Sequence, residues 1–200
     1  YGTNKINLLS NPTSLYAKQP TVYYGLMYLA KNAKKEVKIH TPYIICNDYM
    51  YNELKNIKVP TTIMTNSAEN NGNIFGAVDY LNHKKDIINT GVTIKEYEGG
   101  ISYHGKSMTI DDDIAIVGSF NMDMRSAYID TELMLVINSK DINKQLKASM
   151  EEYEKKAATV KNETEYSHIP EGMKMKELSD KKKNIKAWFG WAMNGLRFLF

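Results

Sequence analysis

Apolar residues along the chain recur with two alternating periods, one typical of helices and one typical of strands. Between residues 21 and 33 they fall at helical spacing, and residues 36–43 then read as a buried strand. The same alternation predicts helices over 48–56, 74–89 and 141–160, and strands over 61–65, 92–97, 103–110, 114–117 and 129–137. Strands that alternate with helices in this way indicate an α/β fold, with a mixed sheet flanked by helices on both faces.

Weaker patterns mark the two ends of the chain. Residues 1–20 show little periodicity and are expected to connect rather than to form an element. We predict one domain over 1–161, a polar linker over 162–180 and a tail over 181–200. Apolar residues of the tail recur at helical spacing from Ile185 to Phe200, which predicts a C-terminal amphipathic helix.

Charge separates this tail from the domain. The 200 residues carry a net charge of +3, but residues 181–200 contain five basic residues and no acid, so the remainder is at −2. A mildly acidic domain argues against a broad nucleic-acid-binding surface. Lysines and tryptophans in the tail favour an interfacial helix on an anionic membrane, and packing against protein is the alternative. No apolar run reaches the length of a membrane span.

Cys46 is the single cysteine, which excludes an internal disulfide and a cysteine-based metal site within this sequence. It follows an apolar run, so we expect a small core or edge residue. The sequence starts at Tyr1 without a signal-like segment. We interpret it as part of a longer protein whose N-terminal portion is missing.

One stretch gathers the side chains that can carry chemistry. His104 and Lys106 are two residues apart, which places them on the same side of an extended segment. The chain then turns back, and a second strand ends near Ser119 and Asn121. Lysine supplies positive charge, serine and asparagine supply hydrogen-bond donors, and histidine can attack phosphorus or move a proton. The sequence therefore predicts a phosphate site here.

The complete spacing resembles the H-x-K-x4-D-x6-G-S-x-N signature of the phospholipase D superfamily. The matching residues are His104, Lys106, Asp111, Gly118, Ser119 and Asn121. Members of that superfamily resolve a phosphodiester through a phosphohistidine, without a metal, and two copies of the motif face each other across one site. This sequence contains one copy. Flanking segments such as Thr41-Pro42-Tyr43, Thr65-Asn66-Ser67 and Thr131-Glu132 are similar to those in the C-terminal half of bacterial cardiolipin synthases.

The resemblance implies roles for the matching residues. His104 corresponds to the general acid/base, while the usual nucleophile is the histidine of the first motif, which is not in this sequence. Lys106 and Asn121 correspond to ligands of the phosphate oxygens, and Ser119 to a residue that lines the site. Glu132 corresponds to a carboxylate that orients a motif histidine. From the pattern alone, Glu132 could equally be a strand-end glutamate in water.

Two further positions belong to the signature without chemistry of their own. Asp111 is expected to be structural, because its place in the turn directs it away from the pocket, and Gly118 belongs to the small-residue turn. Residues 111–113 are a poor metal site, since adjacent residues at a hairpin turn diverge. No metal or cofactor is expected. The polar run 65–73 follows a strand, where α/β proteins bind ligands, although a plain solvated connection explains it as well.

Three functions remain open on this reading. The first is phosphatidyl transfer between phospholipids of the phosphatidylglycerol class, by a protein held peripherally at the bacterial cytoplasmic membrane. In that case the missing N-terminal half supplies the first motif. The second is a phospholipase D-type nuclease or phosphodiesterase that works as a dimer with two copies of His104. The third is a non-catalytic half that binds a lipid or a partner.

Overall fold

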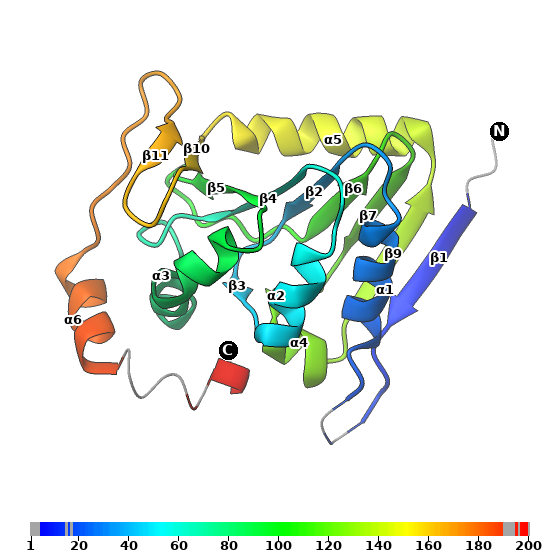
Figure 1. Cartoon of the computed structure of the whole chain (residues 1–200), viewed down its shortest axis with the longest axis horizontal. Helices are drawn as coiled ribbons and strands as arrows, with labels where there is room; N and C mark the ends of the chain where they lie inside the picture. The colour runs from blue at the N-terminus through cyan, green and yellow to red at the C-terminus, as the bar shows by residue number, and fades with distance from the viewer. Residues whose placement is uncertain (1–4, 15, 17, 190–194, 196, 200) are drawn as a thin grey trace.

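A nine-stranded mixed sheet forms the centre of the molecule, with the strand order β1-β9-β7-β6-β2-β4-β5-β10-β11 (Figure 1). The computed structural model describes residues 5–14, 16, 18–189, 195 and 197–199. The sheet strands are β1 (Lys5–Ser10), β2 (Val37–His40), β4 (Thr61–Asn66), β5 (Thr93–Tyr97), β6 (Ser107–Ile110), β7 (Ile114–Gly118), β9 (Leu133–Asn138), β10 (Ala157–Val160) and β11 (Tyr166–His168). Two short strands, β3 (Ile44–Ile45) and β8 (Met122–Asp123), pair separately in parallel.

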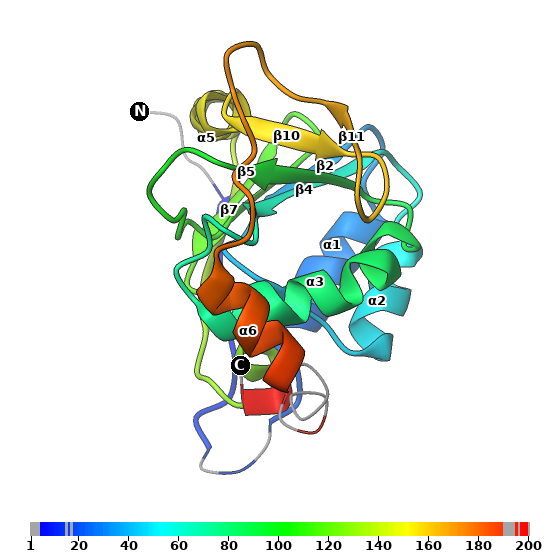
Figure 2. The same ribbon diagram turned by 90° about the vertical axis from the view of Figure 1, so that its left-hand side faces the viewer.

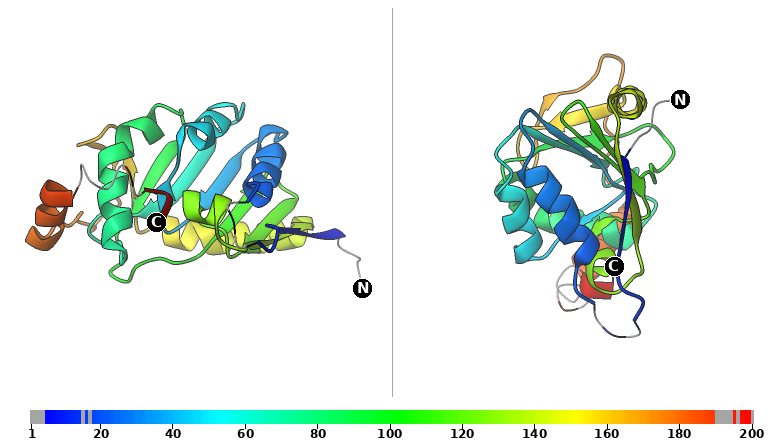
Figure 3. Two further views of the ribbon diagram at one scale, coloured as in Figure 1. Left: turned by 90° about the horizontal axis from the view of Figure 1, so that it is seen from below. Right: turned by 90° about the vertical axis from the view of Figure 1, so that its right-hand side faces the viewer.

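Helices cover both faces of the sheet, and this confirms the predicted α/β fold. α1 (Thr21–Lys31), α2 (Asp48–Lys55) and α3 (Ile74–Ile88) lie on one face, and α5 (Lys140–Glu154) lies on the other (Figure 3). The short α4 (Met124–Tyr128) follows β8. Large apolar side chains from α1 and the central strands fill the core; among them are Tyr23, Met27, Ile39, Ile63 and Ile116.

Strand direction gathers the functional segments at one edge of the sheet. β2, β4 and β5 are parallel, while β6 is antiparallel to β2 and β7 is antiparallel to β6. β2, β4, β5 and β7 therefore end on the side of the sheet where β6 and β9 begin. We call this row of strand ends the site edge. Side chains on the loops at this edge can converge although they are far apart in sequence.

Several predicted element boundaries differ from those in the structure. Residues 1–20 contain β1, which pairs with β9 through its backbone. The sequence did not predict this strand, because its apolar residues Ile6 and Leu8 are exposed and do not mark a buried face. The predicted helix over 141–160 ends at Glu154, and β10 follows it. The predicted linker over 162–180 contains β11, whose polar residues are held by backbone pairing with β10.

The first part of the predicted tail helix is observed. α6 covers Asp180–Phe189, and Arg197–Leu199 form a 3-10 turn. Residues 190–194, 196 and 200 of the predicted helix lie outside the described residues. α6 packs beside α3 (Figure 2). Arg197 forms an ion pair with the buried Asp79 at 2.6 Å, so part of the tail is fastened to its own domain.

Candidate active site

His104 and Lys106 lie together at the site edge of the sheet, on the segment that leads into β6. The Lys106 Nζ is 2.8 Å from the His104 Nδ1 and donates a hydrogen bond to the His104 carbonyl oxygen at 2.8 Å. β6 begins only at Ser107, so the two residues precede the strand that the sequence predicted for them. Their side chains nevertheless meet, as the two-residue spacing indicated. A cation therefore sits directly beside an imidazole.

Ser119 and Asn121 lie on the opposite arm of the same hairpin, just after β7. The Ser119 hydroxyl donates to the Glu132 carboxylate and accepts the Leu133 backbone N–H at 3.0 Å. The Asn121 Nδ2 lies 3.3 Å from the Ser126 Oγ. The Asn121 Oδ1 is buried and has no hydrogen-bond partner among the described residues. An amide oxygen only accepts hydrogen bonds, so the group of Asn121 that could donate to a phosphate oxygen is its Nδ2, which here meets Ser126.

Glu132 binds two hydroxyl groups of the segment that follows β7. Its carboxylate accepts hydrogen bonds from Ser119 and, at 2.9 Å, from Ser126. The side chain is almost fully buried, so the solvated strand-end alternative was wrong. In the described part of the chain its hydrogen bonds go to these hydroxyls and not to His104. A contact with the histidine of a facing motif stays a prediction.

Burial and charge set the protonation of the site. Burial lowers the pKa of His104, and the positive charge of Lys106 lowers it further. Burial also lowers the pKa of Lys106, while the negative charges of Glu132 and Asp123 oppose that shift. The result at pH 7 is a neutral imidazole beside an ammonium, in a partly desolvated place where an anion is attracted strongly.

Asp123 is a titratable residue of this region that the sequence reading did not single out. Burial raises its pKa to about 6, although hydrogen bonds from Ser126 oppose the shift. Its carboxylate caps α4 by accepting the Ser126 backbone N–H at 2.6 Å. The G-S-F-N-x-D segment was visible in the sequence, but nothing in it revealed how deeply this carboxylate is buried.

Asp111 and Gly118 shape the hairpin that carries these groups. The Asp111 carboxylate accepts backbone N–H groups of Lys34, Lys35 and Glu36 at 2.7–3.2 Å, at the turn far from His104. Gly118 lies at the end of β7, opposite Met134 of β9. A Cβ there would stand 2.1 Å from the Leu133 carbonyl oxygen, so only glycine fits.

Asn66 is the most informative residue that sequence reasoning did not assign to the site. Its Nδ2 donates to the Tyr103 carbonyl oxygen at 2.9 Å, and its Oδ1 accepts the Tyr103 N–H at 2.8 Å. Both backbone groups beside His104 are therefore held by one amide. Tyr43 packs edge-on against the His104 ring, with the centroids 6.0 Å apart. The resembling T-P-Y and T-N-S segments were the signals that pointed here.

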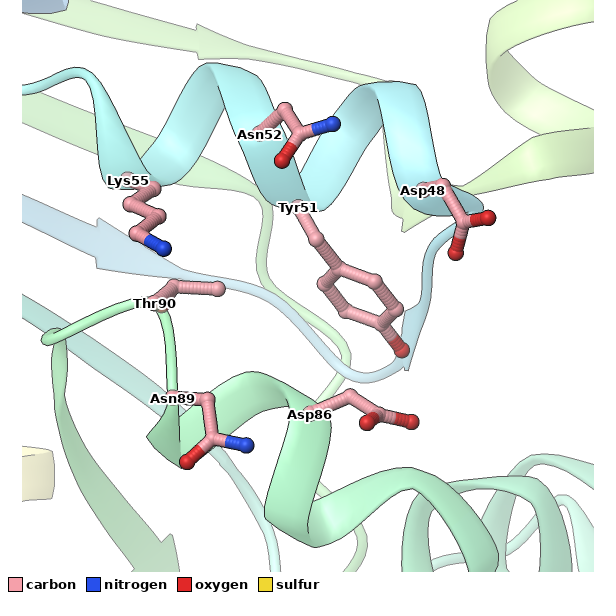
Figure 4. A pocket seen from close by; sticks show the side chains of 7 residues that line it. All are labelled: Asp48, Tyr51, Asn52, Lys55, Asp86, Asn89 and Thr90. Carbon is pink, nitrogen blue, oxygen red and sulfur yellow. The ribbon is translucent and has the colours of Figure 1, made fainter.

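A cavity of about 610 Å³ opens next to His104, between α5 and the segment before β6. Its lining combines aromatic and apolar side chains with polar ones; the former include Tyr97, Tyr103, Leu146, Met150 and Tyr153, and the latter Ser102, Ser149 and Lys156. A second hollow of about 330 Å³ lies between α2 and the end of α3 (Figure 4). Its lining, which includes Asp48, Tyr51 and Asp86, contains none of the signature residues. Of the signature residues, His104 is among those that line the first cavity, whereas Lys106, Ser119 and Asn121 are not, so we place the candidate active site at the His104 side of this cavity.

The sequence matches the family described as "Cardiolipin synthase, PLD-like domain" over residues 26–153. Cardiolipin synthase 1 of Staphylococcus epidermidis (strain ATCC 12228 / FDA PCI 1200) is 30% identical over 159 residues, which cover 78% of this chain and 32% of that protein. Cardiolipin synthase 1 of Staphylococcus aureus (strain COL) is 27% identical over 176 residues, with 84% and 35% covered. The chain thus spans about a third of the length of these curated relatives.

Solved structures share the fold. The phosphatidylserine synthase of Haemophilus influenzae Rd KW20 superposes with a TM-score of 0.70 at 16% identity, over 98% of this chain and 48% of that chain. Nuc from Salmonella typhimurium, a phospholipase D family member, gives 0.62 at 15% identity, over 79% and 99%. The fold and the signature residues at the site edge of the sheet define a phospholipase D-type domain. The chain belongs to the cardiolipin synthase family of such domains.

Proposed function

We propose that this chain contributes one of two H-x-K motifs to a phosphatidyltransferase that joins phospholipids of the phosphatidylglycerol class. The observation that carries the proposal is the cluster at the sheet edge. The His104 Nδ1 lies 2.8 Å from the Lys106 Nζ, and Ser119 and Asn121 follow the neighbouring strand β7. This combination suits a phosphodiester, since the charge attracts the phosphate and the imidazole handles protons.

The reaction then runs in two displacements. The histidine of the first motif attacks phosphorus, an N–P bond forms, and the P–O bond to the leaving glycerol breaks while His104 protonates that oxygen. A hydroxyl of the second lipid next attacks phosphorus, His104 takes its proton, and the N–P bond breaks. Lys106 and Asn121 hold the phosphate oxygens throughout, and Ser119 lines the site. Bound phosphate favours the protonated form of His104, which the first step needs.

The cavity beside His104 gives the rest of the lipid a place. It is lined by Tyr97, Tyr103, Tyr153 and aliphatic residues of α5, and its volume of about 610 Å³ is within the usual range for ligand pockets. We propose that it receives the glycerol backbone and the first carbons of an acyl chain. The phosphate would then lie at the cavity mouth, next to His104.

The tail is proposed to hold the protein peripherally at an anionic membrane, as expected for the bacterial cytoplasmic membrane. Trp188 is 81% exposed, and Lys181, Lys183 and Lys186 are also exposed on α6. Exposed tryptophan and lysine on one short helix suit the interface between headgroups and acyl chains. Among the described residues, no helix is both long and apolar enough to cross a membrane.

A second candidate function is a phosphodiesterase that pairs two copies of His104 in a symmetric dimer. The single copy of the complete signature in these 200 residues favours it. The mildly acidic domain disfavours a nucleic acid as the substrate. A non-catalytic, lipid-binding or partner-binding half is the third candidate.

The test measures turnover of phosphatidylglycerol vesicles by the chain alone, with its oligomeric state fixed by light scattering, and by the chain joined to a half that carries the first motif. We expect cardiolipin from the joined protein only. Turnover by a dimer of this chain, lost on His104→Ala, would establish the phosphodiesterase instead. No turnover by either form would leave the non-catalytic function.

A further inference from the structure

Lys182 differs from the other lysines of the tail because it is buried. Its Nζ donates to the carbonyl oxygens of Ala68, Glu69 and Asn71 at 2.8, 2.6 and 2.9 Å. An ammonium has three donors, and all three are used here. Its neighbours Lys181 and Lys183 are exposed on the same helix. The lysines of the tail are therefore of two kinds: Lys182 is bound inside the protein, and its neighbours face the solvent.

All three carbonyl groups belong to one segment, residues 67–73, which we call the 67–73 loop. It follows β4 at the site edge of the sheet. The Glu69 carboxylate accepts the Ser179 backbone N–H at 2.9 Å, so the residue before α6 is tied to the same loop. Without Lys182, carbonyl groups enclosed under α6 would lose their hydrogen-bond partner, and the loop would have to open to water.

The other side of the 67–73 loop holds the segment that carries His104. The Asn70 Nδ2 lies 3.2 Å from the Asn66 Oδ1 and donates to the Ile101 carbonyl oxygen at 3.2 Å. The Gly72 N–H donates to the Ser102 hydroxyl at 3.1 Å. Asn66 in turn clamps both backbone groups of Tyr103. A continuous set of hydrogen bonds thus leads from the tail helix to the residue next to His104.

We propose that Lys182 is a positioning residue. It fastens α6 to the 67–73 loop and, through Asn70 and Asn66, fixes the backbone that presents His104. The position of α6 beside α3 and against this loop is what makes the connection possible (Figure 2). The consequence for turnover rests on the proposed function, but the consequence for order of the loop does not.

The experiment compares Lys182→Met with Lys181→Met, which removes an exposed charge from the same turn of the same helix. Amide hydrogen exchange is followed in the full chain at residues 66–73 and 101–104. In Lys182→Met we expect exchange there to accelerate about tenfold or more, because the loop opens locally, while the β2 and β6 amides keep their protection. Lys181→Met should leave both regions unchanged, and Lys182→Arg should retain most of the protection.

A second readout follows His104 itself by NMR titration of its imidazole. If the segment loosens, His104 becomes better hydrated and its pKa rises toward the ordinary value, since burial is what lowers it. Equal exchange rates and equal titration in Lys182→Met and Lys181→Met would overturn the proposal. Should Lys182→Met fail to fold, Lys182→Gln takes its place with the same expected direction.

Turnover separates this proposal from the proposed function. In a catalytically competent protein, we expect Lys182→Met to lower kcat more than it raises KM. The exposed lysines of α6, which we propose to meet the membrane, are unchanged in this variant. If Lys182→Met loosens the loop but His104→Ala leaves turnover intact, the proposed function fails and the positioning role stands. If His104→Ala abolishes turnover but the loop stays ordered in Lys182→Met, the positioning role fails alone.

Discussion

The two ends of the β6–β7 hairpin use residues of the same signature for different purposes. At the turn end, the Asp111 carboxylate is occupied by backbone N–H groups of the α1–β2 connection. At the open end, His104 and Lys106 face each other, and the Asn121 Oδ1 has no partner among the described residues. The carboxylate at the turn end is used by the fold, whereas the cation and imidazole at the open end are groups that a phosphate could meet. A sequence signature alone does not separate these two roles.

Lys106→Met should produce the largest contrast between the two ends. Removing the ammonium at the open end is expected to cut kcat about 100- to 1000-fold, by analogy with the loss of a preorganised charge stabiliser. Lys35→Met is the matched control, since Lys35 is exposed at the turn end and pairs with Asp112. Steady-state kinetics on vesicles measures both. Equal effects of the two variants on kcat would contradict a catalytic role for the open end.

Asp111→Ala should have the opposite profile. We expect it to destabilise the fold by roughly 2–3 kcal/mol, because backbone donors lose a charged acceptor. Turnover per folded molecule should stay unchanged. Denaturant unfolding and kinetics together check this, and a normal midpoint with lost activity would contradict the structural role.

The same carboxylate gives a pH dependence with a definite sign. Burial by itself would raise the pKa of Asp111, but the donated backbone N–H groups lower it below the ordinary value. Its contribution to stability is therefore complete above the ordinary pKa of an aspartate and is lost as the pH falls through the lowered, folded-state pKa. In Asp111→Ala the unfolding midpoint should vary less with pH below pH 4 than in the unchanged chain.

Glu132→Gln tests whether the carboxylate under the open end matters through its charge. We expect kcat to fall about 10- to 100-fold, since one of the two hydroxyls, Ser119 or Ser126, loses its acceptor and Lys106 loses a negative charge that supports its protonation. The pKa of Lys106 should fall further. Circular dichroism checks that the fold persists, and an unchanged kcat would remove Glu132 from the site.

Trp188→Ala should have the smallest effect and should leave both ends of the hairpin intact. Trp188 is 81% exposed on α6, so its loss is expected to weaken binding to phosphatidylglycerol vesicles about three- to tenfold, without a change in melting temperature. Binding should also weaken with salt, because the contribution of the exposed lysines is screened. Co-sedimentation beside a thermal melt measures both. Lost stability with unchanged lipid affinity would assign Trp188 to protein packing.

Much of the fold could be predicted because strands and helices with one buried face carry a clear period. β1 and β11 were not predicted. In β1 the apolar Ile6 and Leu8 are exposed, and β11 is held by backbone pairing with β10, which leaves no pattern in the sequence. The open end was predictable from spacing. The burial of Lys182 among three carbonyl groups was not, because a lysine in a basic helix looks the same whether it faces water or a loop.

His104→Ala tests the central claim most directly, with His168→Ala as the control at an exposed histidine on β11. Cardiolipin formation from phosphatidylglycerol vesicles is measured with the chain joined to a half that carries the first motif. If the open end of the hairpin performs proton transfer, His104→Ala should lower kcat about 100- to 10,000-fold. His168→Ala should stay within about twofold, as expected for a surface substitution. Full turnover in His104→Ala would contradict the account.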